Sequence, residues 1–175
     1  MKRFSILLLA IISVALLASC NNNTASKGSN ENNDSTSKAN ETEVVNTELD
    51  AAFKKMWENV TLTNADAYFK TDVAEDFYTI NADGIVQNKE QLLVDTERLR
   101  MLEILDFKFF DQIIKSYDDV GIINGRTQAF LDGAYVGEIF YTAIFIKQNE
   151  TWKYKNWQGT WTKDSPTPPS FISKD

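Results

Sequence analysis

Four long runs of residues in the C-terminal part constrain the fold of this chain more than any other feature. In most of each run apolar and polar side chains alternate, which is the period of an extended strand. The runs are DFKFFDQIIKSY (106–117), VGIINGRTQAFL (120–131), YVGEIFYTAIFIK (135–147) and TWKYKNWQGTWT (151–162). The pairs between them are Asp118-Asp119, Asp132-Gly133 and Gln148-Asn149. Such residues favour tight turns, so we expect four antiparallel strands joined as a meander.

Three helices are predicted upstream of these runs. Thr47, with Asp50 three residues later, is a candidate N-cap for an amphipathic helix of about 14 residues. Asn64 is a candidate cap for a short second helix. Asn88 and Gln91 have the spacing of a capping box, and the leucines that follow form the apolar stripe of a third helix.

A β-hairpin is predicted between the second and third helices. The strand-like segments FYTIN (77–81) and IVQ (85–87) flank the turn residues 82–84. Helices followed by a run of antiparallel strands define an α+β domain, in which three N-terminal helices cover one face of a curved sheet. In the third long run, IFYTAIFI (139–146) is apolar on both faces. The face away from the helices is therefore expected to meet a second copy of the domain, the alternative being a monomer with an apolar outer face.

The N-terminus has the pattern of a secretory signal peptide. Lys2 and Arg3 precede an apolar run, residues 6–18, that is too short to span a bilayer and ends in small residues. The segment LASC (17–20) resembles the bacterial lipobox, and Cys20 is the only cysteine of the chain. We expect residues 1–19 to be removed and Cys20 to be acylated, which anchors the protein to a membrane without spanning it. An ordinary signal peptide with an incidental cysteine is the alternative.

Composition divides the remaining chain into a tether, one domain and a tail. Residues 20–46 are rich in asparagine, serine and threonine and lack aromatic side chains, so a flexible tether is expected there. Residues 47–163 have the length of one domain, and the proline-containing segment 164–175 ends it. Without residues 1–19 the chain has 16 Lys+Arg and 25 Asp+Glu, a net charge of about −9, because Lys2 and Arg3 are lost from 18. Such an acidic chain argues against nucleic-acid binding.

The order of the predicted elements resembles the cone-shaped, cystatin-like fold shared by nuclear transport factor two, ketosteroid isomerase and SnoaL-like cyclases. Two segments carry the likeness, AEDFYTINADGIVQNKEQL (74–92) and VGIINGRTQAFLDGAYVGEIFYTAIFIKQNETWKYKNWQGT (120–160). They are similar to the SnoaL-like and ketosteroid isomerase-like domains of unknown function. The resemblance implies an apolar small-molecule pocket inside the curved sheet and dimers formed through the outer sheet face. In bacterial lipoproteins, an aspartate directly after the lipidated cysteine is associated with retention in the inner membrane. Here Asn21 follows Cys20, and the resemblance therefore implies an outer-membrane protein that faces the periplasm.

Composition restricts any chemistry to carboxylates, Tyr, Lys and Arg. The chain has no histidine, and lipidation would consume its one cysteine, so no His-dependent triad, histidine metal site or thiol nucleophile is expected, and no cofactor. An ungapped comparison with the isomerase motif places Asn81 at the position of the general-base aspartate and Trp57 at that of the oxyanion-stabilising tyrosine. Asn cannot accept a proton near neutral pH. Asp76 and Glu138 are the remaining candidates for a shifted base, although Glu138 is more simply explained as the partner of Arg126 in a cross-strand ion pair.

The last strand-like run is expected to form one wall of the pocket. Strict alternation assigns Trp152, Tyr154, Asn156 and Gln158 to the inner face and the lysines, Trp157 and Trp161 to an outer, partner-facing side. The predicted pocket residues are Trp57, Tyr78, Asn81, Tyr154, Asn156 and Gln158.

Three functions are compatible with these features. The first, which we favour, is an envelope lipoprotein whose domain binds a small apolar or amphipathic molecule, or acts as a scaffold, without catalysis. The second is a small cofactor-independent isomerase, cyclase or hydratase that uses carboxylate and tyrosine groups. The third is a protein that binds a partner through its outer sheet face, in the manner of an immunity protein.

Overall fold

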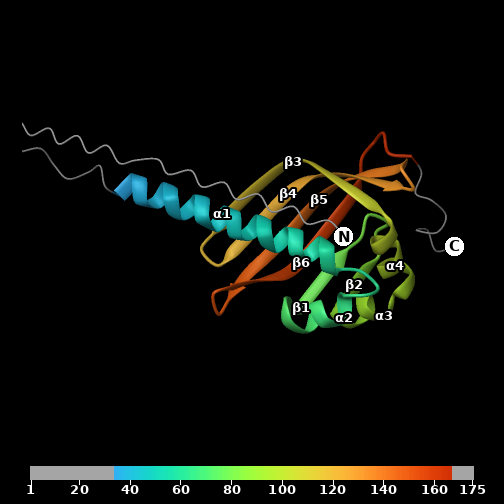
Figure 1. Cartoon of the computed structure of the whole chain (residues 1–175), viewed down its shortest axis with the longest axis horizontal. Helices are drawn as coiled ribbons and strands as arrows, with labels where there is room; N and C mark the ends of the chain where they lie inside the picture. The colour runs from blue at the N-terminus through green and yellow to red at the C-terminus, as the bar shows by residue number, and fades with distance from the viewer. Residues whose placement is uncertain (1–33, 167–175) are drawn as a thin grey trace, which may run out of the picture. The chain divides into compact units, whose positions relative to one another are not determined.

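The structure, a computed structural model, describes residues 34–166, with side chains from residue 43 onward. Within this range one six-stranded sheet has the order β2-β1-β6-β5-β4-β3 (Figure 1). The strands are β1 (Val73–Ile80), β2 (Val86–Asn88), β3 (Asp106–Tyr117), β4 (Val120–Leu131), β5 (Ala134–Gln148) and β6 (Thr151–Trp161). The helices are α1 (Asp34–Asn59), α2 (Ala65–Thr71), α3 (Lys89–Val94) and α4 (Thr96–Ile104). The expected signal peptide, Cys20 and most of the C-terminal tail lie outside the described residues.

The four long strands confirm the predicted meander. β3 and β4 have the bounds that the sequence predicts, whereas β5 is one residue longer at each end and β6 is one residue shorter at its C-terminal end. Asp132 and Gly133 both have positive φ, as do Asn149 and Glu150, which is the conformation that tight hairpins of this twist require. β1 and β2 form the predicted hairpin, but β1 joins the sheet by pairing parallel to β6. The sheet is therefore mainly, but not wholly, antiparallel.

The first helix is longer than predicted. α1 begins at Asp34, so Thr47 lies inside the helix, where its hydroxyl donates a hydrogen bond to the carbonyl oxygen of Glu43 at 2.9 Å. Thr47 is therefore not the N-cap, and the part of the expected tether from Asp34 to Asn46 is helical. In the part of the chain that the structure describes, no helix is both long and apolar enough to cross a membrane.

The predicted third helix is two helices. Asn88 and Gln91 form the expected capping box at the start of α3. The helix then breaks at Asp95, whose carboxylate accepts a hydrogen bond from the backbone N–H of Arg98 and so caps α4. The chain thus has four described helices where three were expected. Asn64 precedes α2 but makes no side-chain cap, because its amide donates instead to the carbonyl oxygen of Glu58.

One extra residue in β6 reverses its inner and outer faces. Tyr154 pairs with Phe145 and Asn156 pairs with Ile144, so Lys155 has no partner of its own across the β5–β6 ladder. Such a bulge shifts the alternation of side chains by one position. The inner face therefore carries Trp152 and Tyr154 before the bulge, but Trp157 and Trp161 after it. The expectation that Trp157 and Trp161 face outward is wrong for this reason.

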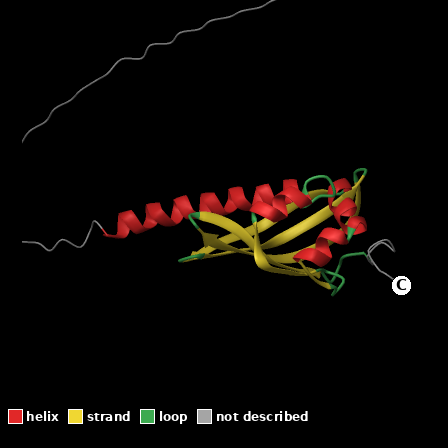
Figure 2. Ribbon diagram, turned by 90° about the horizontal axis from the view of Figure 1, so that it is seen from below, coloured by secondary structure: helices red, strands yellow, loops and turns green. Residues whose placement is uncertain are grey.

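The core lies between α1 and the inner face of the sheet. Figure 2 shows the long helix running along one face of the curved sheet, with the shorter helices at one end. Leu49, Phe53 and Met56 of α1 are almost fully buried and lie on one side of the helix. The ring of Phe53 stacks on Tyr141 with centroids 5.5 Å apart, and Tyr141 in turn stacks on Trp157 at 5.0 Å. This aromatic layer packs between α1 and the sheet.

Candidate functional site

A cavity of about 160 Å³ borders this aromatic layer, since Trp157 lines it. Its walls come from the last turn of α1, the β1–β2 turn, α3, α4 and the inner faces of β3 to β6. The principal apolar lining residues are Met56, Trp57, Val60, Leu92, Met101, Leu102, Leu105, Phe107, Ala129, Val136, Ile139, Tyr154, Trp157 and Trp161. Walls of this kind, with few polar groups, are typical of small-molecule sites.

Small residues on the sheet make room for the cavity and for the indole of Trp161. Ala129 of β4 pairs with Gly137 of β5, and both line the cavity. A Cβ atom on Gly137 would come within 2.7 Å of the Trp161 ring, which is closer than packed carbon atoms approach. Gly137 therefore lets the indole pack against β5 and form one side of the cavity.

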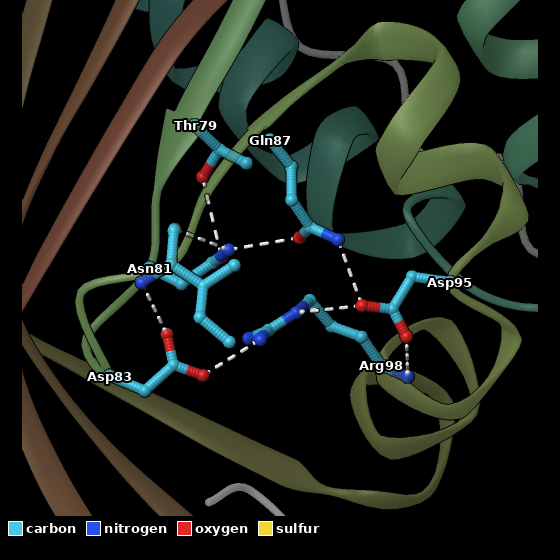
Figure 3. Close-up of polar contacts among 7 residues, drawn as sticks. Thr79, Asn81, Asp83, Gln87, Asp95 and Arg98 are labelled. Carbon is cyan, nitrogen blue, oxygen red and sulfur yellow. Dashed lines mark hydrogen bonds and ion pairs between the residues drawn. The ribbon is translucent and has the colours of Figure 1, made fainter. Parts of the chain in front are cut away.

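A chain of polar contacts closes the side of the cavity formed by the β1–β2 turn and α4 (Figure 3). The Arg98 guanidinium contacts Asp83 at 2.7 Å and Asp95 at 3.5 Å. The three side chains are 17%, 10% and 11% exposed, so the ion pairs are largely shielded from solvent. Gln87 donates to Asp95 at 2.8 Å. These contacts connect the hairpin to α4, and the single guanidinium of Arg98 forms ion pairs with both carboxylates.

Asn81 continues this chain of contacts from the hairpin side. Its amide nitrogen donates to Gln87 Oε1 at 3.0 Å and to the carbonyl oxygen of Ile85 at 3.1 Å. Its amide oxygen accepts a longer hydrogen bond from the Thr79 hydroxyl at 3.4 Å. Asn81 lines the cavity, but both of its N–H groups are occupied in shaping the turn. An amide held in this way has no capacity to remove a proton from a ligand.

Besides Arg98 Nε, which lies 3.5 Å from Asp95, three buried donor groups at the cavity have no hydrogen-bond partner among the described residues. They are the hydroxyl of Thr127 and the indole N–H groups of Trp57 and Trp161. Thr127 is only 1% exposed and lies on the inner face of β4. Because buried polar groups are nearly always hydrogen-bonded in folded proteins, three such groups around one cavity mark it as a place for a molecule that accepts hydrogen bonds.

Half of the predicted pocket residues line the cavity. Trp57, Asn81 and Tyr154 do so, whereas Tyr78, Asn156 and Gln158 do not. Tyr78 is 45% exposed because its neighbours on β1 face inward.

The bulge at Lys155 explains the other two misplacements. Asn156 is buried, but its amide donates to the carbonyl oxygen of Tyr78 at 2.8 Å and so links β6 to β1. Gln158 is exposed, since it follows the bulge on the side opposite Trp157.

Both candidate bases lie outside the cavity. Asp76 is exposed and forms an ion pair with Lys155, whose ammonium holds the pKa of the Asp76 carboxyl below its usual value. Glu138 lies on the face of β5 opposite Gly137 and Ile139. It accepts hydrogen bonds from Arg126 at 2.8 Å and from Gln128 at 2.7 Å, which confirms the predicted cross-strand ion pair. Neither carboxylate can reach a molecule in the cavity.

Tyrosines near the cavity are poor acids. Burial raises the pKa of the Tyr154 hydroxyl well above its usual value. Burial also raises the pKa of the Tyr68 hydroxyl, and the negative charge of Asp72 adds a smaller effect in the same direction. Burial raises the pKa of Tyr141 to about 12. In the described part of the chain no group of three or more Asp, Glu, His or Cys side chains is placed to hold a metal ion.

Sequence reasoning missed Thr127, Trp161, Asp83, Asp95 and Arg98. The spacing of Asp95 and Arg98 is that of an N-cap and its N3 residue, so a second capping signal inside the predicted third helix was present. Thr127 lies four residues after Ile123 on β4, so both side chains face the same side of the sheet. Alternation counted from the apolar Ile123 would therefore have placed Thr127 on the inner face. Trp161 could not be placed without knowledge of the bulge.

Comparisons with known proteins agree on the fold. No model of a protein family matches the sequence, and no curated protein matches it significantly. Among solved structures, a protein of unknown function with a cystatin-like fold from Nostoc punctiforme is 18% identical, with a TM-score of 0.56 over 69% of this chain and 92% of the other. A nuclear transport factor two-like protein from Cytophaga hutchinsonii is 12% identical, with a TM-score of 0.52 over 65% of this chain and 95% of the other.

A third similar structure is a candidate ketosteroid isomerase from Parabacteroides distasonis, which is 10% identical, with a TM-score of 0.54 over 66% of this chain and 86% of the other. At these identities the likeness establishes the fold and not the activity. The domain has the nuclear transport factor two-like, cystatin-like fold, as the resemblance in its sequence implied.

Proposed function

We propose that this protein is an envelope lipoprotein whose domain binds a small, mainly apolar molecule without transforming it. The observation that supports this most strongly is the apolar cavity with the unpartnered donor groups of Thr127, Trp57 and Trp161. A cavity of about 160 Å³ is close to the roughly 150 Å³ apolar cavity that accommodates benzene, so a molecule of one or two small rings is the expected size.

The state of the polar groups argues for binding rather than catalysis. A proton-transfer enzyme needs a base within reach of the substrate. Asp83 and Asp95 at the wall are both engaged by Arg98, and Asn81 occupies the position where the isomerase resemblance would require a base. The alternative, a cofactor-independent isomerase, predicts that the protein converts a β,γ-unsaturated ketone to its conjugated isomer. We expect no increase in enone absorbance above the uncatalysed rate.

The binding proposal is tested by native mass spectrometry of the protein purified under non-denaturing conditions from its own host. A small molecule that leaves the chain only on unfolding supports the proposal. Protein that is free of ligand, and that takes up no small apolar molecule when a mixture is supplied, contradicts it.

The envelope location rests on the sequence of residues 1–20. A thioether-linked lipid on Cys20 would hold the domain at the outer membrane, on the periplasmic side. The Cys20→Ser variant is expected to lose radiolabelled palmitate and to move from the membrane fraction to the soluble periplasmic fraction. Palmitate incorporation that persists in this variant contradicts the anchor.

The outer sheet face favours a second copy of the chain as partner. Phe140, Ile113 and Tyr117 are each more than half exposed, and Phe140 lies on the outer face of β5, one of the two middle strands of the sheet. Exposed apolar groups of this size commonly mark interfaces. A homodimer through this face is expected to dissociate in the Phe140→Glu variant, as measured by light scattering. A wild-type chain that is monomeric at high concentration contradicts this part of the proposal.

A further inference from the structure

Two of the unpartnered donors belong to one row of residues across the sheet. Thr127 of β4 pairs with Ile139 of β5, which pairs with Trp161 of β6, and all three line the cavity. Neighbouring strands are about 4.8 Å apart, so the backbone positions of Thr127 and Trp161 are separated by roughly 10 Å. A ligand lying over Ile139 would therefore touch both ends of the row.

The chemistry of the two groups specifies what they can bind. The Trp161 indole N–H can only donate a hydrogen bond, and it meets no acceptor among residues 43–166. The Thr127 hydroxyl also lacks a partner, and the residues that pair with Thr127 on the neighbouring strands, Phe109 and Ile139, are apolar. A hydrocarbon would leave both donors unsatisfied, whereas a carbonyl or ether oxygen would accept from one or the other.

Charges at the wall disfavour an anionic ligand. The cavity is lined by three carboxylates, Asp83, Asp95 and Glu97, and by one guanidinium, that of Arg98, which gives three negative charges against one positive charge. The Arg98 guanidinium already contacts Asp83 and Asp95. A carboxylate on the ligand would meet like charges without a free counterion.

From these groups we infer that the cavity selects an uncharged ring compound with a hydrogen-bond acceptor, such as a cyclic ketone or lactone. This inference rests on the proposed small-molecule binding and adds the chemical class of the ligand. The hydroxyl of Thr127 and the indole N–H of Trp161 donate to the acceptor, and the acidic wall excludes carboxylates. An ammonium group has no lone pair, so it would leave both donors unsatisfied.

Isothermal titration calorimetry with four related probes tests the inference on the full chain. The probes are indane, 1-indanone, indane-1-carboxylate and 1-aminoindane, which share the ring system and differ in polar group. We expect indane and 1-indanone to bind and the carboxylate to bind at least about tenfold more weakly than 1-indanone. Stronger binding of the carboxylate or the amine than of 1-indanone would overturn the inference.

Variants separate recognition of the acceptor from simple apolar contact. Thr127→Val keeps the shape of the side chain and removes the hydroxyl, so it is expected to weaken 1-indanone about three- to tenfold and to leave indane within about twofold. Trp161→Phe removes the other donor and gives a second comparison if Thr127→Val does not fold. Thr142→Val is the matched control, because the Thr142 hydroxyl donates to Asn124 on the outer face.

Each outcome bears on a different claim. If Thr127→Val and Trp161→Phe change the two affinities by the same factor, or change neither, the cavity binds rings without reading an acceptor and the inference fails while the proposed function stands. If none of the four probes binds the wild-type chain, the proposed function fails, and the inference fails with it.

Discussion

The amide nitrogen of Asn81 donates to Gln87 Oε1 at 3.0 Å, while the amide nitrogen of Gln87 donates to Asp95 at 2.8 Å. Gln87 is therefore oriented from both ends, since a reversed amide would place its oxygen against the Asp95 carboxylate. Asn81 is locked as a donor by this arrangement. The position at which the isomerase resemblance requires a base is thus a structural position in this protein.

Replacing Asn81 with aspartate is expected to destabilise the domain. A carboxylate would face the oxygens of Gln87 and Ile85, which are both acceptors, and we expect the free energy of unfolding to fall by about 1–3 kcal/mol. Urea denaturation measures this change. Asn124→Asp is the matched control, because Asn124 accepts from Thr142 and a carboxylate retains that role. Equal stability of the two variants would show that the Asn81 contacts are unimportant.

Arg98 is expected to be the most important charged residue for stability near the cavity. In Arg98→Met, two carboxylates that are about 10% exposed lose their counterion, so we expect a loss of about 2–4 kcal/mol in the free energy of unfolding. Arg100→Met, at an exposed position of the same helix, should change it by less than about 0.5 kcal/mol. A loss below 0.5 kcal/mol for Arg98→Met would contradict the account of the polar wall.

The effect of the bulge on the two faces of β6 is expected to depend on the presence of an extra residue at position 155 and not on its lysine side chain. Deletion of Lys155 would restore strict alternation and turn either Trp152 and Tyr154 or Trp157 and Trp161 to the outside, so we expect the variant not to fold. Lys155→Ala keeps the bulge and loses only surface contacts with Asp76, the ion pair and a hydrogen bond to its carbonyl oxygen, so it should fold normally. Amide NMR spectra of the two variants distinguish these outcomes, and a folded deletion variant would be incompatible with the described register.

Alkaline pH is expected to destabilise the domain through buried tyrosines. Burial raises the pKa of Tyr141 from 10.0 to about 12, so the folded state keeps a proton that the unfolded state releases. The stabilisation is complete below pH 10 and is lost as the pH rises from 10 toward 12. Urea denaturation between pH 8 and about pH 12 should show a smaller decline for Tyr141→Phe than for wild type. Tyr117→Phe, at an exposed position, should decline as wild type does; identical slopes for all three proteins would refute the assignment.

Local patterns in the sequence predicted most of the fold. The strands β3 to β6 and their turns follow from period-two patterning and from Asp, Asn and Gly at the corners, which are local signals. The start of α1 was misplaced because the polar residues after Asp34 carry no apolar periodicity from which a helix could be recognised.

The candidate site was only partly predictable because its geometry depends on pairing between distant segments. Trp57, Asn81 and Tyr154 were found from the resemblance and from alternation. The inward position of Trp161 depends on the bulge opposite Ile144 and Phe145, which alternation within β6 alone cannot reveal. The Arg98–Asp83 ion pair likewise joins a helix to a turn that lies 15 positions earlier in the chain.

The central claim is that the cavity is a binding site for a small apolar molecule, and a cavity-filling variant tests it most directly. Ala129→Phe would place a ring in the space next to Gly137 and Phe107, with little effect expected on the outer face of the sheet. Calorimetric titration of indane into the wild-type chain and into this variant is the measurement. We predict binding by wild type and its loss in a variant that remains folded by circular dichroism; no binding by wild type, or equal binding by both proteins, would contradict the claim.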